Sequence, residues 1–211
     1  MVLEPRFTLA AAVEQVEGND TVGNFSLTFA EEYRKSGRLH SGRKLLVLRA
    51  AVGGTGFTDS RWGLKDDLFL TMMEMAHTAL SLHPENRLVA LLWHQGETDA
   101  LNNATFAQHL QNLTALVETV RTTYRCEALP FVAGDFVEQW KAENAEICKP
   151  VVDAIRAVCK TVGHARFVES TGLESNHQKT QNGDTIHFSR EALYELGQRY
   201  YNAWRELCDI C

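Results

Sequence analysis

The sequence lacks the features that mark membrane proteins and nucleic-acid-binding proteins. No apolar run in its 211 residues approaches the ~18–20 residues that a membrane-spanning helix needs. Acidic residues outnumber basic ones, 27 against 21, and no basic stripe is visible. We therefore expect neither a membrane nor a nucleic acid as a partner.

The sequence also lacks a recognisable secretion signal. Residues 1–6 do not provide the basic start and long apolar stretch of a signal peptide. The sequence as it stands predicts a cytoplasmic protein, and secretion stays open if a segment precedes Met1. Nothing in the sequence specifies the oligomeric state.

Metal-ligand and cofactor patterns are missing as well. The five cysteines are an odd number without the spacing of a metal site, and neither His-x-x-His nor His-Glu-x-x-His occurs. A Gly-x-Gly-x-x-Gly fingerprint for a dinucleotide is absent. We expect no metal and no cofactor. One alternative stays open, in which His94, Asp99, Asp184 and His187 converge on a cation.

What the sequence does contain is an alternation of strand-length and helical patterns. Four short apolar runs are typical of strands buried on both faces of a parallel sheet. They cover Lys44–Ala50, Leu88–Trp93, Leu129–Gly134 and Arg166–Glu169. Amphipathic stripes predict helices at about 24–36, 68–79, 106–124, from Pro150 to about 162, and after Ser189 as an N-cap.

This alternation predicts a single domain over residues 1–211, built as a three-layer α/β/α sandwich with a mostly parallel, flavodoxin-like sheet. However, the pattern opens on a helix, and residues 1–20 contain no convincing strand. Because a series of β-α units begins with a strand, we expect the first strand of the sheet to be missing from this sequence.

The most informative stretch is Trp93-His94-Gln95-Gly96-Glu97-Thr98-Asp99, directly after an apolar run. It places an amide, an imidazole and two carboxylates where a buried strand ends, which is where open α/β sheets bind ligands. A structural explanation, a polar loop that caps the next helix, requires one such residue rather than four. The heptapeptide therefore predicts a site.

Two further segments could complete that site. Asp184 precedes His187 by three residues, so its carboxylate can accept a hydrogen bond from the imidazole, as in a hydrolase triad. Gly53 and Gly54 follow the first apolar run, where backbone N–H groups can face a developing oxyanion. An ordinary turn explains these glycines equally well.

Together these motifs resemble the SGNH-hydrolase superfamily, in its branch of sialate O-acetylesterases and acetylxylan-esterase-like carbohydrate esterases. The resemblance runs from about Val22 to the C-terminus. Its most specific part is Trp-His-Gln-Gly-Glu at residues 93–97, and the glycine block at 51–55 and the Asp-x-x-His block at 184–187 support it.

The resemblance implies cofactor-free removal of acetyl groups from an acetylated carbohydrate. His187 would act as the general base and then acid, and Asp184 would orient it. Gly53 or Gly54, by a backbone N–H, and Gln95, by its amide, would hold the oxyanion. Glu97 and Asp99 would brace the loop or line the substrate cleft.

The sequence departs from the family in one respect. The family's nucleophile belongs to a Gly-Gln-Ser-Asn block after the first strand, and this sequence contains no such block. Ser26, Thr55 and Ser189 do not follow a strand on the sharp turn that exposes a nucleophile. We therefore expect little esterase activity from this chain alone. A catalytically silent carbohydrate-binding module on the same fold is the alternative.

Overall fold

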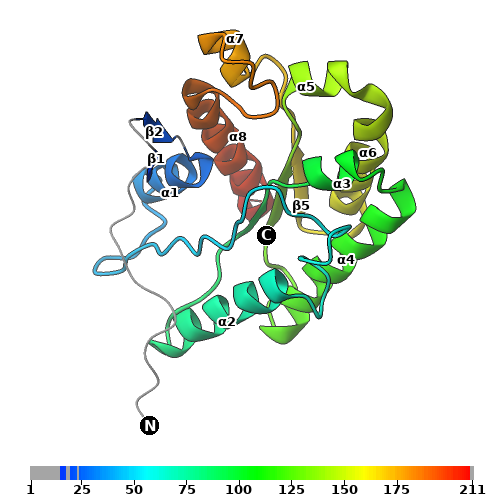
Figure 1. Cartoon of the computed structure of the whole chain (residues 1–211). Coiled ribbons are helices and arrows are strands. Elements are labelled where there is room, and N and C mark those ends of the chain that lie inside the picture. The colour runs from blue at the N-terminus through cyan, green and yellow to red at the C-terminus, as the bar shows by residue number, and fades with distance from the viewer. Residues whose placement is uncertain (1–14, 18–19, 23, 210–211) are drawn as a thin grey trace.

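A three-stranded parallel sheet forms the centre of the protein (Figure 1). The structure, a computed structural model, describes residues 15–17, 20–22 and 24–209. The sheet has the order β3 (Leu91–Trp93), β4 (Phe131–Gly134), β5 (Ala165–Val168). Leu91 pairs with Phe131, which pairs with Ala165, so the carboxyl ends of all three strands meet at one edge. Every residue of the central strand is buried, as its continuous apolar sequence predicts.

Helices cover both faces of this sheet (Figure 1). On one face, α8 (Arg190–Asp209) packs on β4 and β5 and also against α1 (Phe25–Lys35). On the other face, α6 (Ala145–Thr161) packs on the same strands and against α4 (Phe106–Thr123). The predicted three-layer α/β/α arrangement with a parallel sheet is confirmed.

The remaining elements are short, apart from α2 (Asp67–Ser81). Helices α3 (Glu97–Leu101), α5 (Glu138–Glu143) and α7 (Asn176–Thr180) follow or adjoin the carboxyl edge of the sheet. Near the N-terminus, β1 (Gln15–Glu17) and β2 (Asp20–Val22) form an antiparallel pair. The expectation that residues 1–20 contain no convincing strand is therefore wrong, because β1 lies within this range and β2 begins at its last residue. A strand of three residues is too short to show an alternating pattern.

Side-chain caps start two of the long helices where the sequence places them. Thr105 accepts a hydrogen bond from the Gln108 N–H at the start of α4, in a complete capping box. Ser189 accepts one from the Ala192 N–H and caps α8, as predicted.

Helix α6 begins at Ala145, five residues before the predicted start at Pro150, so Pro150 lies inside the helix. Proline removes one backbone hydrogen bond from a helix interior, and the first helical turn is its usual place. The buried side chains of Cys148 and Val151 flank Pro150, so packing of this face holds the helix through the proline.

The predicted strand at 44–50 is the clearest error. This segment has no strand pairing, and the Ala50 N–H donates locally to Leu48 O at 3.2 Å. Leu46 in its middle is 46% exposed. An apolar pattern reports that a segment can be buried, but a strand also needs a neighbour with a free hydrogen-bonding edge.

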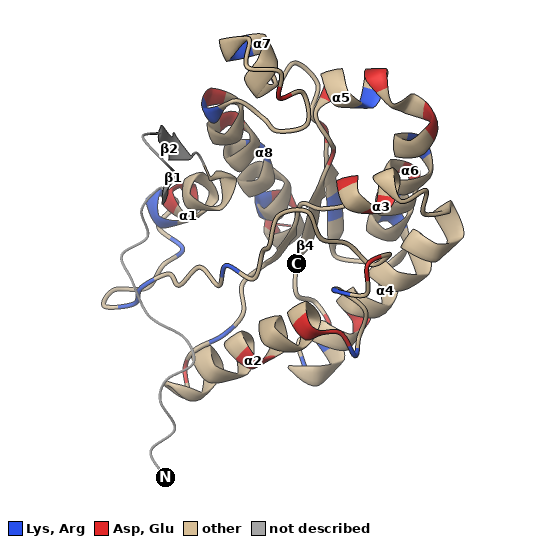
Figure 2. Cartoon of the chain, in the orientation of Figure 1, with Lys and Arg blue, Asp and Glu red and all other residues tan. Residues whose placement is uncertain are grey.

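No helix within the described ranges is long and apolar enough to cross a membrane. Lysine and arginine are distributed over several elements of the fold rather than along one stripe (Figure 2).

We predict that Gly134→Ala destabilises the fold by about 1–3 kcal/mol. A β-carbon at Gly134 would overlap the Tyr200 hydroxyl and lie 2.8 Å from His94 Nδ1. Gly53→Ala is the control, since a β-carbon there meets no atom within 4 Å. Urea denaturation measures both free energies of unfolding. Equal stability of the two variants would contradict the prediction.

Candidate active site

Two of the predicted segments meet at the carboxyl edge of the sheet, and the third is hydrogen-bonded to one of them, the heptapeptide. The heptapeptide leaves the end of β3, and the ring of its His94 lies 5.6 Å from that of Phe188, next to His187. The glycine block joins the heptapeptide through a hydrogen bond of 3.0 Å from Gln95 Nε2 to Thr55 O. Segments far apart in the sequence therefore form one surface.

His187 and Asp184 form a hydrogen-bonded pair in the loop before α8. His187 Nδ1 lies 3.0 Å from each carboxylate oxygen of Asp184, and the His187 N–H also donates to Oδ1 at 3.1 Å. Asn176 Nδ2 donates to Oδ2 at 2.9 Å. Burial opposes ionisation of Asp184, but these hydrogen bonds and the charge of His187 lower its pKa. The side chain of His187 is 73% exposed, so its ring is accessible to a substrate.

His94 and Glu97 lie beside this pair and are much less exposed. Tyr200 donates to Trp93 O at 2.7 Å, and its hydroxyl oxygen lies 3.2 Å from His94 Nδ1. Because the single phenol proton is used on the carbonyl, the His94 Nδ1–H must donate to Tyr200. His94 Nε2 then faces Glu97 Oε1 at 3.9 Å.

Burial shifts both groups toward their neutral forms. It lowers the pKa of His94 to about 4, with a further contribution from the charge of His187. Burial also raises the pKa of Glu97 to about 6.

We predict that His94 weakens the protein in mild acid. Its pKa in the folded chain lies below the ordinary 6.5, so the unfolded chain binds this proton first as the pH falls from about 6.5 to 4. Stability is therefore lost over that window, by up to about 3 kcal/mol. Glu97 acts in the opposite sense between about 6 and 4.5, where the folded chain binds its proton first.

His94→Gln should therefore flatten the loss of stability between pH 6.5 and 4, measured by urea denaturation at each pH. The exposed His77 on α2 supplies the control His77→Gln. An unchanged slope in His94→Gln would show that His94 takes up its proton equally in both states.

Gln95 and Asp99 connect the heptapeptide to the glycine block from inside. Gln95 Nε2 donates to Asp99 Oδ2 at 3.1 Å as well as to Thr55 O, and the Thr58 N–H donates to Asp99 Oδ1 at 2.8 Å. Burial of Asp99 opposes its ionisation, but the His109 imidazole beside it and the hydrogen bonds from Thr58 and Gln95 outweigh burial and lower its pKa to about 2. Asp99 is therefore a buried, ionised acceptor.

Gly53 and Gly54 lie in the exposed turn before Thr55. Gly54 has a φ of +69°, a conformation that glycine adopts without strain. Thr55 is buried and donates to Val52 O at 2.7 Å, while Trp62 Nε1 donates to its hydroxyl at 3.0 Å. These contacts fix the end of the turn and leave its glycines at the surface.

The candidate hydroxyls all donate their protons elsewhere or cap a helix. Ser26 donates to Asn24 Oδ1 at 2.7 Å, Thr55 donates to Val52 O, and Ser189 accepts at the start of α8. In the part of the chain that the structure describes, no hydroxyl hydrogen-bonds to His187 Nε2.

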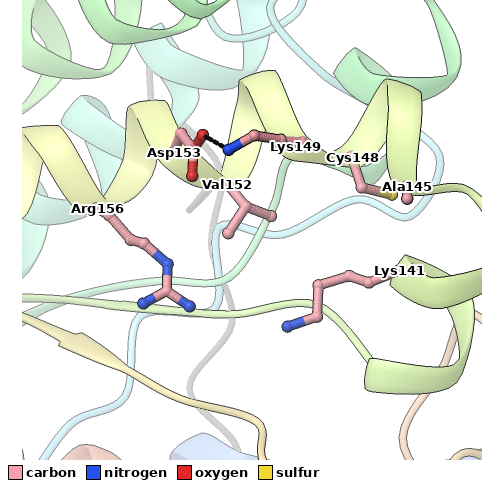
Figure 3. A pocket seen from close by; sticks show the side chains of 7 residues that line it. All are labelled: Lys141, Ala145, Cys148, Lys149, Val152, Asp153 and Arg156. Atoms are coloured by element: carbon pink, nitrogen blue, oxygen red, sulfur yellow. Dashed lines mark hydrogen bonds and ion pairs between the residues drawn. The ribbon is translucent and has the colours of Figure 1, made fainter.

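A separate cleft of about 450 Å³ opens between α5 and α6 (Figure 3). Its charged side chains are Lys141, Lys149, Asp153 and Arg156. Lys149 pairs with Asp153, Lys141 pairs with Asp135, and Arg156 pairs with Glu169. None of the predicted site residues lines this cleft.

The described ranges contain no group of three or more His, Cys, Asp or Glu side chains placed to hold a metal ion. Sequence reasoning missed Asn176, Tyr200 and His109 as partners of site residues. Their contacts cross 8 to 106 positions of sequence, and no local motif marks them.

The fold is an α/β domain with a His–Asp pair at the carboxyl edge of a parallel sheet, an arrangement typical of hydrolases. The family described as carbohydrate esterase, sialic acid-specific acetylesterase matches residues 8–206. The chain belongs to this family. The match begins at residue 8, whereas the sequence motifs predict a resemblance only from about Val22.

Known proteins agree with this assignment. A probable 9-O-acetyl-N-acetylneuraminic acid deacetylase of Escherichia coli (strain K12) is 26% identical over 49% of this chain. The match spans 42% of that relative's length. The crystal structure of NanS superimposes with a TM-score of 0.78 at 19% identity, covering 90% of this chain and 72% of NanS. A protein from Arabidopsis thaliana gives a TM-score of 0.55 at 20% identity, covering 73% of this chain and 58% of its own. Both structures support the fold.

Proposed function

We propose that the protein hydrolyses O-acetyl esters of an acetylated carbohydrate, with acetylated sialic acid as the first candidate. The observation that carries this proposal is the His187–Asp184 pair, exposed beside the heptapeptide in a chain of the sialic acid-specific acetylesterase family. The curated relative, a probable deacetylase of an acetylated sialic acid, supports the choice of sugar.

Each site residue has a role in this proposal. His187 Nε2 accepts the proton of an attacking hydroxyl as its oxygen bonds to the acetyl carbon, and then gives that proton to the departing sugar oxygen. Asp184 holds the Nδ1–H and supports the imidazolium. Water then repeats the sequence and releases acetate.

The oxyanion is proposed to lie between the glycine turn and Gln95. Gly53 or Gly54 would donate a backbone N–H. When an ester binds, rotation of the Gln95 amide about its hydrogen bond to Asp99 would move the other N–H from Thr55 O to the oxyanion. Glu97 would line the cleft beside His187, and Asp99 would brace the loop from inside.

The absence of a hydroxyl on His187 Nε2 among the residues described favours one second candidate, a silent carbohydrate-binding module. The sequence contains no Gly-Gln-Ser-Asn block to supply that hydroxyl. A silent module on this fold would bind an acetylated sugar at the same edge and leave the ester intact.

Acetate release separates the two functions. The protein is incubated with 9-O-acetyl-N-acetylneuraminic acid, with acetylated xylan and with 4-nitrophenyl acetate, and acetate is measured while calorimetry reports binding. Release from the sialic acid ester above the uncatalysed rate supports the esterase. Binding without release supports the silent module, and neither binding nor release contradicts both.

A further inference from the structure

A buried histidine of α4 lies behind the candidate site and has no role in the mechanism above. His109 is 1% exposed, and neither of its ring nitrogens makes a hydrogen bond within the described residues. Its Nδ1 lies 3.4 Å from Oδ2 of Asp99, which is fully buried. Placing a carboxylate and an imidazole together in the core is costly unless they interact. The pair therefore requires an explanation.

The partners of Asp99 determine which nitrogen of His109 carries a proton. An ionised carboxylate only accepts hydrogen bonds, so the Nδ1 that faces it at 3.4 Å carries a proton rather than a lone pair. Phe57 holds the imidazole in this orientation, with its ring 5.4 Å from that of His109 in a T-shaped contact and stacked 5.7 Å from that of Trp93. His109 is thus held with a proton on Nδ1.

Asp99 connects His109 to Gln95 and to the loop that follows the glycine turn. Oδ2 accepts from Gln95 at 3.1 Å, and Oδ1 accepts from the Thr58 N–H at 2.8 Å. Gly56, directly after the glycine block, packs on the carboxylate, because a β-carbon there would lie 2.7 Å from Oδ1. A rotation of Asp99 would disturb the Gln95 amide and the 55–58 loop together.

We propose that His109 is a positioning residue of this site. Its Nδ1, 3.4 Å from Oδ2, keeps the Asp99 carboxylate in place, and Asp99 in turn accepts one N–H of Gln95. The other N–H, which donates to Thr55 O in this structure, is the one that would reach the oxyanion. The inference depends on the proposed function for its catalytic consequence, while the chain of contacts from His109 through Asp99 to Gln95 can be tested without turnover.

A matched pair of substitutions tests the chain. His109→Asn places an amide N–H near the position of Nδ1, whereas His109→Gln places it near that of Nε2. In ¹⁵N-labelled protein, we expect a slowly exchanging Nδ1–H of His109 in the unsubstituted chain. We expect the Gln95 side-chain amide to be protected from exchange there and in His109→Asn, and to exchange at least ~10-fold faster in His109→Gln, as a local opening requires.

Kinetics supply the second readout. His109→Gln should lower kcat for acetate release by about 10- to 100-fold with KM within twofold, which is below the loss of a whole oxyanion donor. His109→Asn should retain kcat within about threefold, by the same comparison.

Three results would overturn the proposal: a proton on Nε2 instead of Nδ1, a Gln95 amide unaffected in His109→Gln, or equal kcat losses in both variants. If His109→Gln does not fold, two measurements still test the proposal: the position of the ring proton of His109 in the unsubstituted chain, and the exchange rate of the Gln95 amide in His109→Asn. If the unsubstituted chain releases no acetate, the proposed function fails, and the two NMR readouts still test the positioning chain.

Discussion

Arg121→Met is expected to destabilise the fold by about 3–5 kcal/mol, since each buried polar group left without a partner costs ~1–3 kcal/mol. Arg121 lies in the last turn of α4 and is 5% exposed. Its guanidinium donates to Leu129 O before β4 and to Val162 O, Gly163 O and His164 O before β5. One side chain thus satisfies the carbonyls that lead into two strands of the sheet.

The positive charge of Arg121 also lies at the C-terminus of a helix. Val162 is the C-cap of α6, where a cation interacts well with the free carbonyls of the last turn. Arg121→Lys keeps the charge but not the fork of donors, so an intermediate loss of about 1–3 kcal/mol is expected. Urea denaturation measures both variants, with the exposed Arg34→Met as the control. A loss below 1 kcal/mol in Arg121→Met would show that water replaces the guanidinium at low cost.

The layers of this fold could be predicted because they depend on local patterns. The stripe at 106–124 and the apolar runs before Gly134 and Glu169 each report their own burial, and α4, β4 and β5 form close to where they predict. The segment at 44–50 has an equally apolar sequence, but strand formation depends on a paired neighbour that the segment itself does not encode.

The candidate site shows the same division. Asp184 and His187 are three residues apart, so sequence alone could predict their hydrogen bond. Nothing local indicates that His109 reaches Asp99, or that Tyr200 fixes the proton of His94. Those contacts exist because α8 packs on one face of the sheet and α4 packs against α6 on the other, which is a property of the whole fold.

His187→Ala is expected to lower kcat for acetate release by at least ~10²–10⁴-fold, the usual contribution of a general base. Stability should change by less than about 0.5 kcal/mol, because the side chain is largely exposed. His40, also exposed, gives the control His40→Ala. Asp184→Asn should also lower kcat strongly, because an amide no longer supports the imidazolium.

The outcome of this substitution also decides where the nucleophile lies. Turnover that disappears in His187→Ala and in Ser26→Ala or Thr55→Ala would assign the attacking hydroxyl to that residue. Turnover that disappears in His187→Ala and persists in both others would require a nucleophile outside these candidates. Equal, measurable rates in His187→Ala and the unsubstituted chain would contradict the role of His187 as base. No turnover in either protein would favour the carbohydrate-binding module, because the His187–Asp184 pair would then have no proton to transfer.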